Sequence, residues 1–492
     1  MNERFNVCAG WLKDNPVIGT CYIDRIRGEE IISFQYNREW LLNNHIVIDP
    51  NLSEITGRQY PPKNHTFGFL EDISPDRWGR RLIDRKESRD AVNENRKAHT
   101  LLASDYLLGV SDICRTGGIR LCNEDGIFIN SDDANYIPPI TELRRLENAV
   151  QCVEKNQGNI DPYLKDLLAP GSSLGGARPK ANVIDVDGSI WIAKFPSKND
   201  DYNVGAWEMV AHDMAKMCGI SVPTAKVLNL SGVGSTFLVK RFDRNNGQRL
   251  HYASAMTMLG EHDNSDNKTG YLDIVSVLGK IGADFNTDTR YLFERLVFNI
   301  CVGNTDDHLR NHGFILTDKG WRLSAAFDIN PSLYKDNMSL LVDFDSNDKS
   351  LDLAMSVSEL FGYESQEALE YIHMVQGKFR TELPSVAKTR GLSRSDIEFM
   401  NGSFSECYRE VSLGHSVVVN TFNATETDDY IKPVEYNGYN ADIYDDRIVI
   451  KDPDGSETQI TDMDDVDSIN SEADLREYLE RYIDNLDLGC ER

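Results

Sequence analysis

The stretch Val302-Gly303-Asn304-Thr305-Asp306-Asp307-His308-Leu309-Arg310-Asn311 determines how the rest of the chain is interpreted. It brings two carboxylates, an imidazole, a guanidinium and two amide side chains into one short segment. The apolar run at residues 292–302 leads into it and predicts a buried helix that ends where the polar group begins. The alternative is a solvated turn rich in Asn and Asp, which the stretch alone does not exclude.

A second aspartate follows this stretch in an apolar setting. Residues 313–316 and 321–323 predict two strands joined by a turn at 318–320, and Asp328 comes next, between Phe327 and Ile329. An acid among apolar residues is costly to bury without a partner or a metal ion. Asp306 and Asn311 have the Asp-x4-Asn spacing of a protein-kinase catalytic loop, in which a metal-binding aspartate follows a similar hairpin. The sequence therefore predicts a Mg²⁺ site between Asn311 and Asp328, and a buried helix-capping Asp328 is the alternative.

The segment before this helix combines a glycine-rich loop with a lysine. Residues 171–180 contain Gly171, Gly175 and Gly176, which let a backbone approach phosphate groups closely. A predicted hairpin then places Lys194 on its second strand, and a helix expected at residues 203–218 carries Glu208. A buried lysine needs an acidic partner to stay charged, so we expect a Lys194–Glu208 ion pair. The alternatives are a lysine at a sheet edge and an acid that only complements the helix dipole.

Composition limits the class of protein. The chain has 492 residues, enough for two to four domains, and a formal net charge of −27, which disfavours binding nucleic acid over its own surface. Nine cysteines occur without a Cys-x-x-Cys pair, which argues against a structural zinc site and suits a reducing compartment. No apolar run reaches the roughly 18 residues of a membrane span. We expect a cytoplasmic protein without a membrane partner.

The order of predicted elements indicates an α+β fold. We expect two lobes like those of a protein kinase, a β-rich N-terminal lobe and a helical C-terminal lobe, with a small acidic unit appended. In the N-terminal part, Ser74 and Pro75 are predicted to begin an Arg-rich helix whose charged face is in water. The last stretch carries 21 acidic and 6 basic residues, about half of the net charge. Within it, residues 447–450 predict a strand and residues 473–483 an amphipathic helix. The predicted parts are an N-terminal subdomain (1–135), a nucleotide-binding part of the N-lobe (136–245), a helical catalytic lobe (246–415) and the acidic unit (421–492).

These motifs together resemble the HipA family of bacterial serine/threonine kinases, the toxins of type II toxin-antitoxin pairs. The resemblance covers residues from about 5 to about 415. It rests on segments at residues 69–77, 173–180, 192–196, 241–244, 304–311 and 327–329.

The resemblance implies a role for each matching residue. Asp306 would be the catalytic base, Asn311 and Asp328 would hold Mg²⁺, and Lys194 would contact ATP with support from Glu208. The phosphate loop, the hinge and the catalytic loop would supply further ATP contacts from Gly175, Gly176, Ala177, Lys180, Lys240, Phe242 and His308. Family members phosphorylate a serine of their own phosphate loop and lose activity, and the matching residue here is Ser173, with Ser172 as the alternative.

The resemblance also implies a function and partners. The chain would be an ATP- and Mg²⁺-dependent protein kinase acting as a toxin, with a small helix-turn-helix antitoxin that binds DNA. Its protein substrate would be an aminoacyl-tRNA synthetase or another translation factor. Lys240 departs from the acid that some members carry in the hinge, and the acidic unit after about residue 421 has no counterpart in the family. A small-molecule phosphotransferase and a nucleotide-dependent co-repressor or scaffold are the alternatives.

Overall fold

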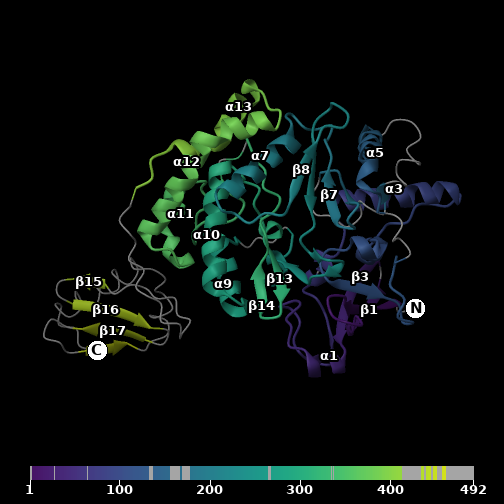
Figure 1. Ribbon diagram of the computed structural model, residues 1–492. Helices are drawn as coiled ribbons and strands as arrows, with labels where there is room; N and C mark the ends of the chain where they lie inside the picture. The colour runs from purple at the N-terminus through teal and green to yellow at the C-terminus, as the bar shows by residue number, and fades with distance from the viewer. Residues whose placement is uncertain are drawn as a thin grey trace. The chain divides into compact units, whose positions relative to one another are not determined.

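Two compact units, Met1–Ser416 and Val417–Arg492, divide the chain. The computed structural model (Figure 1) describes residues 3–460 except 27, 64, 132–136, 156–166, 169–177, 264–267, 334, 336, 413–433, 437–438, 445–446 and 452–456. Within them the larger unit combines four β-sheets with helices, which agrees with the mixed class predicted. The division into two lobes and the domain boundaries at 135 and 245 stay predictions.

The N-terminal part is built on a five-stranded antiparallel sheet of order β4-β3-β2-β1-β5. The side chains of this sheet and its helices form one buried apolar cluster, which includes Phe34, Trp40 and Phe69. The strands are β1 (Glu3–Ala9), β2 (Val17–Ile26), β3 (Glu29–Tyr36), β4 (Arg58–Gln59) and β5 (Ile119–Cys122), and the helices are α1 (Arg38–Asn43), α2 (Gly68–Asp72), α3 (Arg77–Asn93) and α4 (Ala103–Gly109).

Helix α3 begins later than predicted. Its N-cap is Asp76, whose side chain accepts a hydrogen bond from the Gly79 N–H, so the prediction of Ser74 as N-cap is wrong. Aspartate is as good an N-cap as serine, and sequence alone gave no reason to prefer the later residue. The helix also packs beyond the N-terminal sheet, because Trp78 and Leu82 share a core with the next sheet.

That next sheet is antiparallel, with the order β6-β7-β9-β8. Its strands are β6 (Lys180–Ile184), β7 (Ile190–Lys194), β8 (Ala225–Leu228) and β9 (Thr236–Lys240), and the associated helices are α5 (Leu143–Lys155) and α7 (Val204–Met217). The predicted hairpin and the helix that follows it are therefore confirmed within one or two residues. Two short strands, β10 (Arg244–Asn245) and β11 (Gln248–Arg249), follow.

A helical region follows, around the largest cluster of buried apolar side chains. It comprises α8 (Ala255–Met258), α9 (Tyr271–Ile281), α10 (Phe285–Val302), α11 (Leu351–Ser356), α12 (Ser365–Thr389) and α13 (Arg394–Met400), with the sheet of β12 (Tyr252–Ser254), β13 (Gly313–Thr317) and β14 (Gly320–Leu323). Helix α10 is the predicted helix before the polar stretch, and it ends at Gly303 with a φ of 71°. A Cβ there would lie 2.5 Å from the Ser403 carbonyl oxygen, so this helix end requires glycine.

The smaller unit contains a four-stranded antiparallel sheet of order β15-β16-β17-β18. The strands are β15 (Val434–Tyr436), β16 (Tyr439–Tyr444), β17 (Arg447–Lys451) and β18 (Glu457–Ile460). The strand predicted at residues 447–450 is therefore present, whereas the helix predicted at 473–483 lies outside the described residues.

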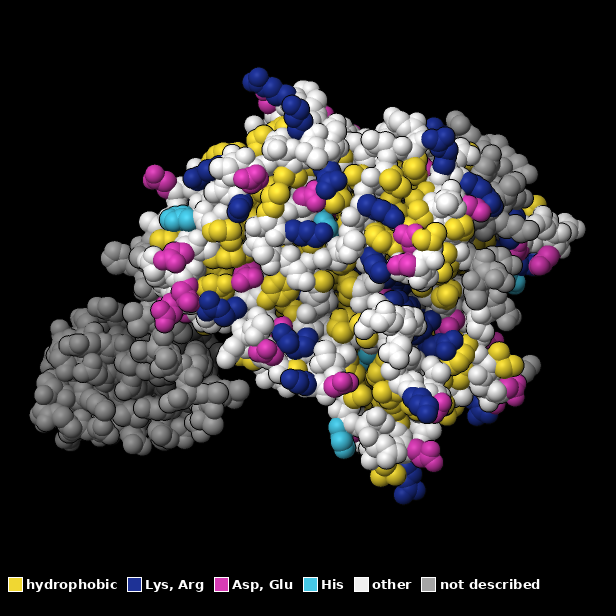
Figure 2. All heavy atoms as spheres, in the orientation of Figure 1, with side chains coloured by type: hydrophobic (Ala, Val, Ile, Leu, Met, Phe, Trp, Pro, Cys, Tyr) yellow, Lys and Arg dark blue, Asp and Glu magenta, His cyan; other side chains and the backbone are white. Residues whose placement is uncertain are grey.

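Charged groups of both signs lie near each other on the face of the larger unit seen in Figure 2. Lys and Arg side chains there lie among Asp and Glu side chains and exposed apolar groups. Among the residues that the structure describes, none of the helices has both the length and the apolar character needed to cross a bilayer.

Candidate functional site

A cavity of about 860 Å³ brings together most of the predicted site residues that the structure describes. Its size is that of a site for a ligand as large as a nucleotide. Apolar side chains of β7, β9 and residues 326–329 line one part, and charged side chains line the rest. The predicted residues on its wall are Lys180, Lys194, Glu208, Lys240, Phe242, His308, Asn311 and Asp328.

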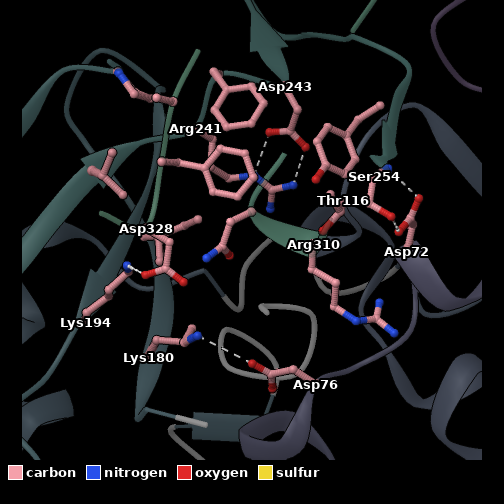
Figure 3. Close-up of a pocket in the computed structure, with 18 of the residues that line it drawn as sticks. Asp72, Asp76, Thr116, Lys180, Lys194, Arg241, Asp243, Ser254, Arg310 and Asp328 are labelled. Atoms are coloured by element: carbon pink, nitrogen blue, oxygen red, sulfur yellow. Dashed lines mark hydrogen bonds and ion pairs between the residues drawn. The ribbon is translucent and has the colours of Figure 1, made fainter. Parts of the chain in front are cut away.

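Lys194 lies between two carboxylates that come from distant parts of the chain. Its Nζ is 2.5 Å from Glu208 Oε1 on α7 and 2.5 Å from Asp328 Oδ1. Burial lowers the pKa of the Lys194 ammonium, but Asp328 and Glu208 outweigh this effect and hold the pKa above its usual value. The predicted Lys194–Glu208 pair is thus present, and the lysine is charged where it faces the cavity (Figure 3).

Asp328 has an unusual backbone as well as a buried carboxylate. Its φ of 59° lies in the left-handed region, which non-glycine residues adopt at an energetic cost and often at functional sites. Burial raises the pKa of its carboxyl, but Lys194 and Lys180 outweigh burial and hold the pKa below the usual range. Asn330 Nδ2 donates a hydrogen bond to Asp328 Oδ1 at 3.2 Å, the oxygen that also pairs with Lys194. The charged form is therefore the stable one, as a cation ligand requires.

The polar stretch after α10 places its members on different sides. Asn311 and His308 line the cavity, and Asn311 Nδ2 donates to the Asp306 carbonyl at 3.2 Å. The Asp306 side chain is 70% exposed and is not among the cavity-lining groups. Its Oδ1 accepts from Lys335 Nζ at 3.0 Å. The Asp306 side chain is thus accessible from solvent.

The buried Asp307 side chain, next to Asp306, fixes the loop to the residues packed around it. Its buried carboxylate accepts hydrogen bonds from the Tyr271 hydroxyl and from Asn299 Nδ2 at 2.8 Å, and it lies 2.8 Å from His312 Nε2. Burial raises the pKa of the carboxyl, but His312 and the hydrogen bonds outweigh it and lower the pKa. The sequence did not indicate this role, because only tertiary packing separates the two adjacent aspartates.

Lys180 also has an acidic partner that the sequence did not reveal. Its Nζ lies 3.5 Å from Asp76 Oδ2, at the start of α3. Both side chains are buried and face the cavity in Figure 3. The Arg-rich helix therefore contributes its N-cap to the site, although most of its arginines were expected in water.

Residues 239–242, which include the predicted hinge residues Lys240 and Phe242, line the cavity. The N–H groups of Lys240 and Arg241 donate to the carbonyls of Thr224 and Ile190, so they are not free to bind a ligand. The Phe242 ring lies 5.3 Å from that of Phe327. Lys240 Nζ lies 3.7 Å from Asp187 Oδ2. A flat ring in this region would contact Phe242 and its aromatic neighbour rather than those two N–H groups.

The glycine-rich loop is the part of the prediction that the structure leaves open. Gly175, Gly176 and Ala177, together with Ser172 and Ser173, lie outside the described residues. Their phosphate-binding and autophosphorylation roles stay predictions. Among the described residues, no group of three His, Cys, Asp or Glu side chains is arranged around a common metal position.

Comparison with known proteins shows what this part of the chain is similar to. Residues 172–383 match the HipA-like C-terminal domain. Two proteins of Sinorhizobium fredii, named "Putative kinase Y4dM" and "Putative kinase Y4mE", are 30% and 26% identical over 155 and 182 residues. These stretches are 29% and 32% of this chain and only 37% and 41% of the lengths of those relatives.

The fold is similar to that of a solved chain. This chain matches one in the HipA, HipB and operator DNA complex of a Shewanella oneidensis MR-1 toxin-antitoxin system with a TM-score of 0.57 and 15% identity. The match covers 82% of this chain and 95% of the other. At this identity the likeness concerns the fold. The HipA-like domain contains Lys180, Lys194, Glu208 and the loop from Asp306 to Asn311. Over residues 172–383 the chain is therefore similar to the HipA-like C-terminal domain.

Proposed function

We propose that this protein is an ATP- and Mg²⁺-dependent serine/threonine protein kinase that acts as a HipA-like toxin. The observation that carries the proposal is the position of Lys194, held between Glu208 and Asp328 in a cavity that Asn311 also lines. A lysine, a metal-binding aspartate and an asparagine are the parts that phosphoryl transfer needs around the phosphates of ATP.

Each of these residues has a distinct task in the proposed reaction. Lys194 and Lys180 bind the phosphates, and Phe242 contacts the base in the apolar part of the cavity. Asp306 orients the hydroxyl of the protein substrate and accepts its proton. Its exposure suits this task, because the acceptor belongs to another macromolecule that approaches from outside the cavity.

The residues present fit Mg²⁺. The Asp328 carboxylate is ionised, and Asn311 offers an amide oxygen on the same cavity wall, which are the hard oxygen donors that Mg²⁺ binds alongside water and phosphate. When bound, Mg²⁺ supplies positive charge that neutralises phosphate oxygens. The left-handed backbone of Asp328 directs its carboxylate toward the cavity.

Incubation with γ-labelled ATP tests the proposal. The purified protein should label a serine or threonine on itself or in a lysate, and chelation of divalent ions should abolish the label. Label on a small molecule instead of a protein would favour the small-molecule phosphotransferase, and no transfer at all would favour the nucleotide-dependent scaffold.

The proposal extends to regulation and partners. Ser173 of the phosphate loop is the proposed autophosphorylation site, because a phosphate there would add nearly two negative charges close to the site for the phosphates of ATP. Phosphopeptide mapping after incubation with ATP should find it, and an active enzyme with an unmodified loop would contradict this step.

The proposed partner is a small helix-turn-helix antitoxin, through which the protein would be linked to DNA. The support is the similar fold of a chain solved together with HipB and operator DNA. An aminoacyl-tRNA synthetase or another translation factor is the proposed substrate, and a cytoplasmic location stays a prediction. Expression of this chain alone should slow cell growth, and expression together with a neighbouring antitoxin gene should restore growth.

A further inference from the structure

Two lysines face the cavity from neighbouring strands, and for only one of them, Lys194, did the sequence predict an acidic partner, Glu208. Lys180 on β6 and Lys194 on β7 are directly opposed in the antiparallel register. Both are buried and line the cavity. Lys194 has Glu208 and Asp328 as partners, whereas the ion pair of Lys180 is with Asp76. Figure 3 shows the Lys180 and Asp76 side chains extending toward each other across the cavity.

Asp76 is held in this position by the start of α3. Its Oδ1 accepts from the Gly79 N–H at 2.8 Å as the helix N-cap, which leaves Oδ2 directed at Lys180. Two residues later, Trp78 Nε1 donates to the Lys180 carbonyl at 3.1 Å. Trp78 is 1% exposed and packs in one core with Ala181, Ala193 and Leu238 of the sheet. The first turn of α3 therefore fixes both the backbone and the side chain of Lys180.

The charges around the pair make it sensitive to the loss of either partner. The charged groups that face Lys180 are Asp76, Asp328 and Lys194. Burial lowers the pKa of the Lys180 ammonium, and Asp76 opposes that effect more strongly than Asp328 does. Burial raises the pKa of Asp76 to about 6, and Lys180 opposes it. Burial is the stronger influence on both pKa values, and each charge opposes the effect of burial on the other.

We propose that Asp76 is a positioning residue for phosphate binding, which keeps Lys180 charged and directed into the cavity before nucleotide arrives. The inference rests on the proposed function, because it takes the cavity to be the nucleotide site. It gives helix α3 of the N-terminal part a direct role in nucleotide affinity. Glu208 of α7 is the corresponding partner of Lys194.

A change in proton balance distinguishes this role from simple structural support. Without Asp76, the buried Lys180 keeps only the weaker influence of Asp328, so the free variant should give up the Lys180 proton more readily. The phosphates of a nucleotide would restore the charge, and binding to the variant should then take up a proton from solvent. In the wild-type protein the Asp76 carboxylate favours the protonated form of Lys180 before nucleotide arrives, so binding should take up less proton than in the variant.

The Asp76→Asn variant isolates the charge, since asparagine is an equally good N-cap and can still accept from Gly79. The experiment is calorimetric titration of the full chain with ADP and MgCl₂ at pH 8, in two buffers of different ionisation enthalpy. Asp76→Asn should bind about tenfold more weakly than wild type and should take up a proton. The difference in ADP affinity between the variant and wild type should be smaller at pH 6, where wild-type Asp76 is itself partly protonated.

Matched variants complete the test. Asp84→Asn makes the same chemical change in the same helix, where Asp84 accepts from the Tyr106 hydroxyl and does not line the cavity, and it should bind like wild type. Lys180→Met should bind weakly at both pH values without proton uptake. Adding Asp76→Asn to Lys180→Met should cost nothing further, because Asp76 acts through Lys180.

Two results would overturn the inference alone. One is an Asp76→Asn protein that binds ADP with wild-type affinity and no proton uptake while Lys180→Met is weak. The other is an Asp76→Asn effect equally large in the Lys180→Met background, since the carboxylate would then act elsewhere. If the wild-type protein fails to bind ADP or ATP, the proposed function falls, and this inference with it.

Discussion

Asp306 and Asp307 are adjacent in the chain, but they lie in two different regions of the molecule. The Asp306 side chain is 70% exposed and pairs with Lys335, whereas that of Asp307 is 4% exposed and has three polar contacts. The exposed side of the loop can offer a base to a large acceptor. The buried side fixes the loop to α9, to α10 and to His312, the residue before β13, so that Asn311 and the proposed base Asp306 keep their positions.

The comparison predicts that the exposed side carries chemistry without contributing much to stability. Asp306→Asn should reduce phosphate transfer at least about 100-fold, because a positioned general base contributes about 10²- to 10⁴-fold. ATP affinity and the melting temperature should stay close to wild type. Labelling with γ-labelled ATP and a thermal melt measure both quantities, and Asp318→Asn in the exposed β13–β14 turn is the matched control. Unchanged labelling in Asp306→Asn would remove Asp306 from the proposed mechanism.

The buried side should show the opposite pattern. Asp307→Ala leaves Asn299, Tyr271 and His312 without their shared acceptor, and we expect the free energy of unfolding to fall by about 3–5 kcal/mol. Asp306→Ala should lower it by less than about 1 kcal/mol, as for an exposed ion pair. Urea denaturation of the two variants measures the difference. Equal losses of unfolding free energy in the two variants would contradict the prediction that Asp307 stabilises the fold and Asp306 does not.

The pH dependence of stability should also show the contribution of the buried Asp307, through a smaller effect. The pKa of Asp307 is lowered in the folded protein, so its contribution to stability is present above its unfolded pKa of about 3.9 and is lost as pH falls below that value. Wild type should therefore lose more unfolding free energy than Asp307→Asn between pH 5 and pH 3. Asp328 and Asp243 also have lowered pKa values, but their contributions are common to both proteins and cancel. Parallel pH profiles would contradict the prediction.

The smallest effect is expected for the partner of Asp306. Lys335→Met removes an exposed ion pair in which the lysine side chain is 54% exposed, so the unfolding free energy should change by less than about 1 kcal/mol. Phosphate transfer should change by less than about fivefold, which corresponds to the same energy. Lys319→Met in the β13–β14 turn is the control. A loss as large as that of Asp306→Asn would show that Lys335 itself takes part in the reaction.

Local signals predicted much of this structure. The strand-like runs on either side of the Asp187-Gly188 turn predicted the β6–β7 hairpin, and the apolar run before Gly303 predicted α10. The Lys194–Glu208 pair was predictable because a lysine on a buried strand requires a nearby acid. Helix starts were less predictable, as the shift from Ser74 to Asp76 shows, because several residues in a row can act as N-cap.

The sequence by itself determined the inventory of the site. Strand and helix patterns placed Lys194 and Glu208 on separate elements, and the 302–311 stretch and Asp328 were predicted as parts of one site from their residue types and spacing. Only the tertiary structure decided which carboxylate serves which lysine, and which of two adjacent aspartates is exposed. The physical reason is that burial and pairing depend on elements far apart in the chain. Asp76 and Lys180 are 104 positions apart in the sequence and form an ion pair in the folded protein. No local sequence pattern predicts this pair.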